Sequence, residues 1–265
     1  HPARYNRWYN KLFPGWIEIL KRELIDCKTV LDIGCGYNSP LQYCPNIDSS
    51  LGIELFEPYL EESQKKGLHN QYLKADVKTV DFKPKSFEAV LALELLEHLD
   101  KEEGYRLIKK MESWARKKII ITTPNGYLTQ DSYDQNPFQV HKSGWKTKEL
   151  EGLGFKVFGM NGWKKLRQEK GLIKYRPVFF WNLFSCLTQK IAYRYPRFAF
   201  QLFAVKKLNY STDNSLSGLW VFSTDLLYSK KIEKKENEII NSSWGNIVFH
   251  TPLNNQIPFD IFSAS

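Results

Sequence analysis

Residues 28–40 constrain the fold of this chain more than any other stretch of it. Their first half, at 30–33, is a short apolar run of the kind that forms a buried parallel strand. The run then breaks at Gly34 and Gly36, which let the backbone turn sharply and approach a ligand closely. In α/β domains, nucleotide-like ligands bind at the carboxyl ends of the strands. The stretch therefore predicts an α/β domain whose first strand leads into a cofactor loop.

A dinucleotide-binding loop is one interpretation of these glycines. That loop requires G-x-G-x-x-G, with an acid about 20 residues later. Here Gly34, Gly36 and Ser39 fall at the glycine positions, and Glu54 falls at the position of the acid. Because Ser39 replaces the third glycine, the pattern of a nicotinamide-dependent oxidoreductase is met only in part.

Asp32 favours a different class of cofactor. It completes the motif D-I-G-C-G, which resembles the first motif of class I S-adenosylmethionine-dependent methyltransferases. A carboxylate here can face the ammonium group of that cofactor, whereas it would repel a pyrophosphate. Asn38 stands where the family often has another glycine, and asparagine tolerates left-handed backbone better than most residues. The resemblance implies that Asp32, Gly34, Cys35 and Gly36 bind S-adenosylmethionine.

Two downstream acids match further positions of the same family. Glu54 follows the second predicted strand, where the resemblance implies that its carboxylate accepts hydrogen bonds from both ribose hydroxyls. The next residue, Leu55, is then also expected to contact the cofactor. Asp76 and Val77 end the third predicted strand. By the same resemblance, the Asp76 carboxylate accepts a hydrogen bond from the adenine amine, and the Val77 N–H meets the ring.

Apolar runs predict seven strands and the helices between them. The strands cover residues 30–33, 51–55, 71–77, 86–93, 118–123, 155–160 and 198–205, and helices are expected at 16–25, 57–66, 101–116 and 147–153. We therefore expect an α/β, Rossmann-like, seven-stranded and mostly parallel sheet with helices on both faces. Residues 1–207 would form one S-adenosylmethionine-binding methyltransferase domain, with an insertion at 163–197 between the last two strands. Residues 208–265 would form a C-terminal extension, to which we assign no function.

A second motif, Glu94-x-x-Glu97-His98, follows the fourth predicted strand, and His141 lies further along. Together they look like the metal-binding pattern of small-RNA 2′-O-methyltransferases and of ubiquinone-pathway O-methyltransferases. The resemblance implies that Glu94, Glu97, His98 and His141 hold Mg²⁺ or Mn²⁺, ions for which carboxylates and imidazoles are suitable ligands. Without a metal, His141 is the first candidate for a general base and His98 the second, while Glu94 contacts only the methionine end of the cofactor. The predicted catalytic residues are thus His141, His98 and Glu97.

The basic character of the chain is concentrated in one segment. The whole chain has a net charge of +9, and residues 163–207 alone hold eleven lysines and arginines against one acid. Aromatic side chains are interleaved with these bases at 163–197. This composition suits a cap whose aromatics form the roof of a substrate pocket, or an anionic membrane surface. Single-stranded nucleic acid is the third and least favoured partner.

The acceptor and the cellular location are further expectations. The four cysteines show no metal or disulfide spacing, and no apolar signal segment precedes residue 28, so we expect a cytoplasmic protein that is at most peripheral to a membrane. We expect methyl transfer to an oxygen of a small-molecule, saccharide (glycan) or lipid-linked acceptor. RNA ribose is the alternative acceptor. A cofactor-binding interaction module without turnover is the alternative from outside the enzymes.

Overall fold

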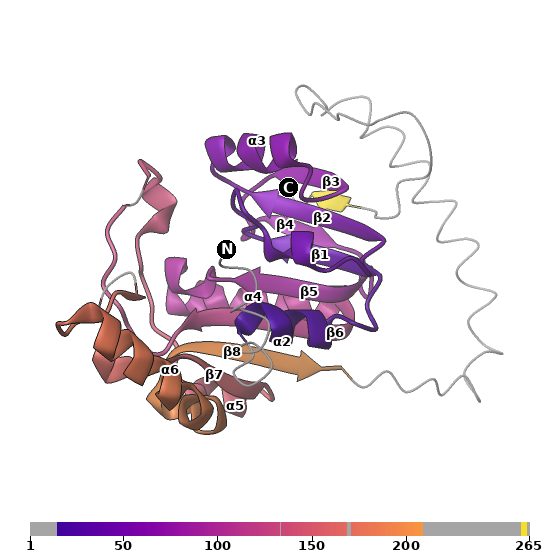
Figure 1. The fold of residues 1–265 in the computed structure, drawn as a ribbon. Helices are drawn as coiled ribbons and strands as arrows, with labels where there is room; N and C mark the ends of the chain where they lie inside the picture. The colour runs from indigo at the N-terminus through magenta and orange to yellow at the C-terminus, as the bar shows by residue number, and fades with distance from the viewer. Residues whose placement is uncertain (1–14, 133, 169–170, 209–260, 264–265) are drawn as a thin grey trace, which may run out of the picture. The chain divides into compact units, whose positions relative to one another are not determined.

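A computed structural model describes residues 15–132, 134–168, 171–208 and 261–263 of the chain. Within them, seven strands form one sheet in the order β3-β2-β1-β5-β6-β8-β7 (Figure 1). The strands are β1 (Thr29–Ile33), β2 (Ser49–Glu54), β3 (Gln71–Lys74), β5 (Phe87–Leu93), β6 (Ala115–Pro124), β7 (Lys156–Trp163) and β8 (Ala199–Lys207). β8 runs antiparallel to both of its neighbours, and the other pairs are parallel. The predicted Rossmann-like, mostly parallel seven-stranded sheet is confirmed.

The predicted helices form within a few residues of their expected ends. They are α2 (Trp16–Glu23), α3 (Glu57–Lys66), α4 (Lys101–Trp114) and α5 (Thr147–Gly152), and the insertion adds α6 (Val178–Arg194). Local sequence explains the ends. Gly67, with a φ of 62°, terminates α3, and the Asp100 N–H donates to the Glu103 carboxylate (3.1 Å) where α4 begins.

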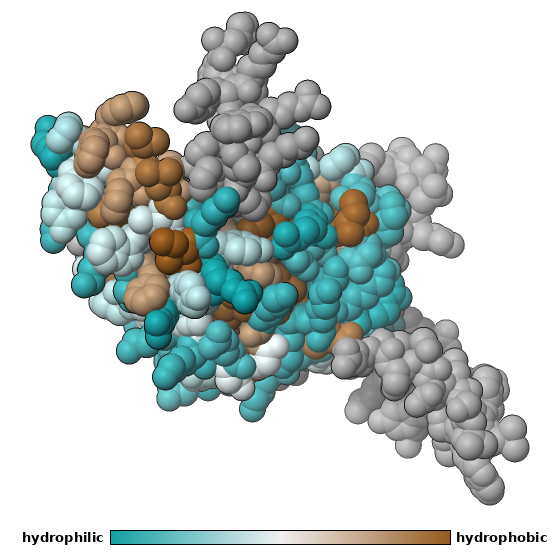
Figure 2. Space-filling model, turned by 60° about the horizontal axis from the view of Figure 1, so that its bottom comes forward, coloured by the Kyte–Doolittle hydropathy of each residue, from teal (hydrophilic) through white to brown (hydrophobic). Residues whose placement is uncertain are grey.

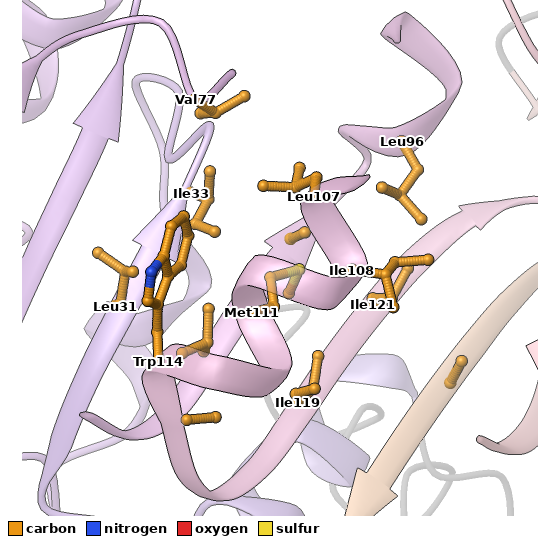
Figure 3. Packing of buried hydrophobic residues seen from close by; sticks show 14 of the residues in the cluster. Leu31, Ile33, Val77, Leu96, Leu107, Ile108, Met111, Trp114, Ile119 and Ile121 are labelled. Atoms are coloured by element: carbon orange, nitrogen blue, oxygen red, sulfur yellow. The ribbon is translucent and has the colours of Figure 1, made fainter. Parts of the chain in front are cut away.

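The central strands are buried on both faces. Leu31 of β1 packs with Met111 and Trp114 of α4 in one apolar cluster (Figure 3). Val30, its neighbour in sequence, packs with Leu20 of α2 in a second cluster on the opposite face. Because successive side chains of a strand point to opposite faces, a continuous apolar run fills both layers. This packing fixes β1 between its neighbours, and the carboxyl ends of β1, β2, β5 and β6 meet at one edge of the sheet.

Two short strands are missed by the sequence patterns. β4 (Val80–Phe82) pairs antiparallel with β9 (Ile261–Ser263) in a separate two-stranded sheet. Three residues are too few to show a strand periodicity, which explains the omission. β9 belongs to the predicted C-terminal extension, so at least this part of the extension pairs with the body of the domain. Residues 209–260 of the extension lie outside the described residues.

The third predicted strand is too long. β3 ends at Lys74, and Asp76 and Val77 lie in the turn that follows it. The Asp76 carboxylate accepts a hydrogen bond from the Lys78 N–H (2.9 Å), and its backbone carbonyl accepts one from the Thr79 N–H (3.0 Å). A short acidic side chain that binds the backbone in this way closes a turn. The strand therefore stops before the acid instead of including it.

The insertion between β7 and β8 is built around α6. A short 3-10 helix, Lys164–Leu166, precedes it, and another, Pro196–Phe198, follows it. None of the helices in the described ranges is long and apolar enough to cross a membrane.

Gly104 of α4 offers a test of this packing. A Cβ added there would come within 2.5 Å of the buried Trp145 ring. We expect Gly104→Ala to lower the free energy of unfolding by about 1–3 kcal/mol, because overpacking outweighs the gain in helix propensity. Urea denaturation measures the change. Gly152→Ala in α5 is the control, since no described residue lies within 4 Å of its added Cβ, and it should be neutral or stabilising. Equal effects of the two substitutions would contradict the packing described here.

Candidate active site

The loop after β1 makes the sharp turn that its glycines predict. Gly34 and Gly36 have left-handed backbone conformations, with φ of 67° and 58°. The N–H groups of Gly34 and Cys35 both donate to the carbonyl of Ile53 on β2 (2.8 and 3.0 Å). An added Cβ on Gly34 would lie 2.9 Å from the Leu95 side chain. The loop is thus anchored at the carboxyl ends of β1 and β2, and its glycines bring bare backbone to the site.

Glu54 joins the end of β2 to this loop. Its carboxylate accepts hydrogen bonds from the N–H groups of Gly36 (3.0 Å), Leu55 (2.9 Å) and Phe56 (2.9 Å). Burial raises the pKa of Glu54, and these three hydrogen bonds oppose the rise. Glu54 therefore lies at the end of β2, as the sequence predicts. The N–H of Leu55, however, already donates to the Glu54 carboxylate.

Asp32 is only 1% exposed at the end of β1. The Ser39 hydroxyl donates to its Oδ2 (2.5 Å), and Nε2 of His69 lies 3.6 Å from the same oxygen. Burial raises the pKa of Asp32 to about 6, against the effect of the Ser39 hydrogen bond, and burial lowers the pKa of His69 to about 4. His69 is therefore neutral at pH 7, and the contact is not an ion pair. Sequence reasoning missed His69, since no local pattern sets it apart.

Glu97, His98 and His141 come together beside the loop. One potential ligand atom from each lies within 4.8 Å of the others. Oε2 of Glu97 is buried and has no hydrogen-bond partner among the residues that the structure describes. Burial, and then the negative charge of Glu94, raise the pKa of Glu97 well above its usual value. A buried carboxylate oxygen without a partner is costly unless a cation or a donor satisfies it, so these residues fit a metal ion.

Backbone carbonyls orient both imidazoles. Nδ1 of His141 lies 2.6 Å from the Leu128 carbonyl oxygen, and Nδ1 of His98 lies 3.3 Å from that of Val140. A carbonyl oxygen only accepts, so Nδ1 is the protonated nitrogen in each neutral ring. Burial lowers the pKa of both rings, that of His98 to about 4, and both are neutral at pH 7. The two Nε2 lone pairs are therefore free to bind a metal or a proton.

Glu94 lies outside this three-residue cluster. Its backbone has a left-handed φ of 53°, and its N–H donates to the Thr122 carbonyl (3.0 Å). Its Oε1 accepts a hydrogen bond from Gln201 of β8 (2.7 Å), and burial raises its pKa. The structure thus brings together three of the four predicted metal ligands. The fourth is turned towards Gln201, although it still lines the pocket.

Two carbonyl groups join the turn after β5 to the loop before α5. The Glu97 carbonyl accepts hydrogen bonds from the N–H groups of Lys142 (2.7 Å) and Ser143 (3.1 Å). The Leu96 carbonyl accepts from the Ser143 hydroxyl (3.1 Å) and from the Trp145 indole N–H (3.3 Å). These four bonds hold the second histidine of the cluster beside the first, although the two are distant in sequence.

A pocket of about 560 Å³ connects the loop with the cluster. Nine predicted site residues line it: Asp32, Gly34, Cys35, Gly36, Glu54, Glu94, Glu97, His98 and His141. Leu55, Asp76 and Val77 are not part of the lining. Lining residues that sequence reasoning missed include Tyr37, Tyr59, Thr122, Gln130, Asn161, Phe200 and Gln201. Ligands of α/β sheets bind at the carboxyl ends of the parallel strands, and this rule predicts Thr122, which lies at that end of β6. The others come from loops, α3 and the antiparallel pair β7 and β8, where the rule gives no signal.

Comparison with known proteins relates part of the chain to methyltransferases. Residues 31–120 match a family model described as a methyltransferase domain. A small RNA 2′-O-methyltransferase of Tetrahymena thermophila is 26% identical over 182 residues, which are 54% of this chain and 42% of the relative. The chain therefore corresponds to less than half the length of that curated relative.

Two solved structures resemble the fold. A SAM-dependent methyltransferase from Archaeoglobus fulgidus aligns over 77% of this chain and 100% of its own, with 22% identity and a TM-score of 0.45. The methyltransferase domain of bacterial CtHen1 aligns over 72% of this chain and 97% of its own, with 17% identity and a TM-score of 0.46.

Asp32 provides a pH-dependent prediction. Its folded pKa of about 6 exceeds the value of about 3.9 for an unfolded chain, so the ionised form destabilises the fold. This cost is absent below about pH 4, grows as the pH rises to about 6, and is constant above that. Asp32→Asn removes the charge and keeps an acceptor for Ser39. We expect it to raise the free energy of unfolding by about 1–3 kcal/mol at pH 8 and by little at pH 4.

Chemical denaturation at the two pH values measures the effect. Asp48→Asn is the matched control, because Asp48 is exposed and pairs with Lys28 at the surface. It should change the stability by no more than about 0.5 kcal/mol at either pH. A loss of stability in Asp32→Asn at pH 8 is the result that would count against the buried charge.

Proposed function

The chain carries a class I S-adenosylmethionine-dependent methyltransferase domain, and we propose that it methylates a hydroxyl oxygen of its acceptor with the help of a divalent cation. One observation carries the proposal, the unpartnered buried Oε2 of Glu97 beside two neutral imidazoles. A site that only aligned the two substrates for methyl transfer would not need a buried carboxylate without a partner. A carboxylate oxygen with two imidazole nitrogens is, however, a donor set that Mn²⁺ and related ions accept.

The loop after β1 is the proposed cofactor site. Gly34 and Gly36 leave no side chain between the backbone and a ligand, and the Glu54 carboxylate lies beside them to accept hydrogen bonds from hydroxyl groups. We do not extend the proposal to Leu55 or Asp76. Both lie outside the pocket lining, and their polar groups already bind within the chain.

The reaction converts a sulfonium into a thioether while the acceptor hydroxyl loses a proton. The chain therefore has to hold the acceptor oxygen in line with the methyl group, exclude water and remove the proton. Glu97 would hold the cation through Oε2, and His98 and His141 through their Nε2 atoms. A bound cation lowers the pKa of a hydroxyl that it contacts. In the chain without an ion, neutral His141 is the proton acceptor.

We propose an acceptor with two neighbouring oxygens. An ion such as Mg²⁺ takes six ligands, and three protein groups leave positions open for the substrate. Adjacent hydroxyls could occupy two of them at once and so fix the oxygen that is methylated. Small molecules, saccharides and lipid-linked acceptors with vicinal hydroxyls all meet this requirement.

The ribose at the 3′ end of an RNA is a second candidate acceptor. It also carries two adjacent hydroxyls. The similarity to a small RNA 2′-O-methyltransferase is the specific observation in its favour.

The cation is tested most simply by binding. Calorimetric titration with Mn²⁺ should give one site per chain, and Glu97→Gln should weaken it by at least about tenfold, because it removes the charge but keeps the size. Excess chelator should abolish methyl transfer, and added Mn²⁺ should restore it. Glu151→Gln, the same change at an exposed position of α5, should leave binding intact. Full methyl transfer in excess chelator would reject the cation.

The cofactor loop gives a separate prediction. Glu54→Gln should weaken the binding of S-adenosylhomocysteine by about 1–3 kcal/mol, the range for hydrogen bonds to a charged group. Glu57→Gln is the control, because Glu57 begins α3 as a partner of Lys74 at the surface. Calorimetry should show no binding of NAD. Unchanged affinity in Glu54→Gln would remove this residue from the proposed site.

The acceptor classes are separated by following a labelled methyl group. The chain is incubated with methyl-labelled S-adenosylmethionine and with separated lipid, glycan and RNA fractions. Label in RNA that becomes resistant to periodate would establish ribose, since periodate cleaves only free vicinal diols. Label in the lipid or glycan fraction, with none in RNA, would support the first proposal.

A further inference from the structure

The helix α6 presents its large apolar side chains outward. Phe180, Leu183, Leu187 and Ile191 are each more than half exposed, and Phe179 is 82% exposed. Steps of three or four residues along a helix place the first four on one face. Hydrophobic surface gathers in Figure 2 on the side of the molecule where Figure 1 shows α6. We call these five residues the outer face of α6.

The inward side of α6 is small and polar instead. Ser185 and Ala192 are buried against β7, where Cβ atoms added to Gly162 and Gly159 would lie 2.4 and 2.0 Å from their carbonyl oxygens. The Gln189 side chain accepts from the Gly162 N–H (2.8 Å) and donates to the Gly159 carbonyl (3.1 Å). Hydrogen bonds and close backbone contacts thus hold α6 against β7. An ordinary surface helix has the reverse arrangement, with its apolar stripe turned inward.

Basic residues flank α6 in the sequence. The described residues 163–168 and 171–207 include ten lysines and arginines and no aspartate or glutamate. Lys174 and Arg176 precede α6, while Arg194 ends it and Arg197 follows it. An exposed apolar stripe flanked by bases is the pattern of a helix that lies in a lipid–water interface.

We propose that α6 docks the protein onto the surface of an anionic lipid bilayer. A second copy of the chain fits less well, because pairing two outer faces would bring the two sets of bases together. Single-stranded nucleic acid also fits less well. It stacks on aromatic rings, whereas Leu183, Leu187 and Ile191 have none. No described helix can span a membrane, so the contact is interfacial.

The insertion that carries α6 also reaches the pocket. Several residues of this part of the chain line the pocket. Asn161 and Gly171 lie on either side of the short helix that precedes α6, and Phe200 follows α6. A docked chain would therefore receive an acceptor from the membrane surface. This consequence rests on the proposed function and narrows its acceptors to lipid-linked ones, whereas the docking itself does not depend on any activity.

Sedimentation with vesicles tests the docking. The full chain should sediment with vesicles of phosphatidylcholine and phosphatidylserine, and much less with phosphatidylcholine alone. Salt should weaken the binding without abolishing it, because the apolar contribution is not screened. The triple variant Phe180→Gln, Leu187→Gln and Ile191→Gln should lower the partition coefficient at high salt by at least about tenfold. Its melting temperature should change little, since more than half of each side chain is exposed.

Matched variants separate the contributions. Ile25→Gln changes an exposed apolar residue outside α6 and should bind vesicles normally. Arg194→Gln with Arg197→Gln should reduce binding at low salt only, whereas Arg106→Gln in α4 should not reduce it. This pair of arginine substitutions also keeps the test decisive if the triple variant fails to fold.

Three results would overturn the proposal. The first is a chain that does not sediment with phosphatidylserine vesicles at low salt. The second is a folded triple variant that binds as the unchanged chain does. The third is a chain whose self-association or binding to single-stranded RNA is abolished by the triple substitution while its vesicle binding is retained. None of these assays contains a methyl donor, metal or acceptor, so failure here leaves the proposed function standing.

Discussion

The site depends on two backbone carbonyl groups. Those of Leu96 and Glu97, in the turn after β5, together accept four hydrogen bonds from the loop at 142–145. The buried Trp145 also holds that loop in place. Its ring lies against Gly104, and Nζ of Lys101 lies 3.6 Å from the ring centroid. These contacts between two loop segments thus bring one carboxylate and two imidazoles together.

The residues around the pocket include features that lower the stability of the fold, which a purely structural region would not need. Glu94 has a left-handed backbone without being glycine, Asp32 is buried beside a neutral histidine, and Glu97 has a buried oxygen without a partner in the described part of the chain. Each lowers the stability of the free chain. Strain and unsatisfied charge of this kind gather where a ligand compensates for them. Their grouping around one pocket supports reading the pocket as a place where charged ligands bind.

Much of this arrangement is readable from the sequence, for definite reasons. An apolar run that ends in Asp32-Ile33-Gly34 specifies both a buried strand and a sharp turn, so β1 and its loop are predicted closely. A mostly parallel sheet with helices on both faces follows once strands alternate with helices. Contacts between distant segments are not encoded locally, and Gln201 and His69 were missed for that reason. Glu94 shows the same limit, because its spacing matches a ligand whereas its side chain binds Gln201. The outward orientation of the large apolar side chains of α6 is also not predictable from the sequence, because it depends on which small side chains of the helix pack against β7.

We propose that Glu97, His98 and His141 hold one divalent cation, and that the same pocket takes the methyl donor. Electron spin echo spectroscopy of the Mn²⁺-loaded chain tests it most directly, because it detects nitrogen nuclei bonded to the metal. We predict modulation from two imidazole nitrogens, reduced to one in His141→Gln and unchanged in His69→Gln. Mn²⁺ bound without any coordinated nitrogen would contradict the account.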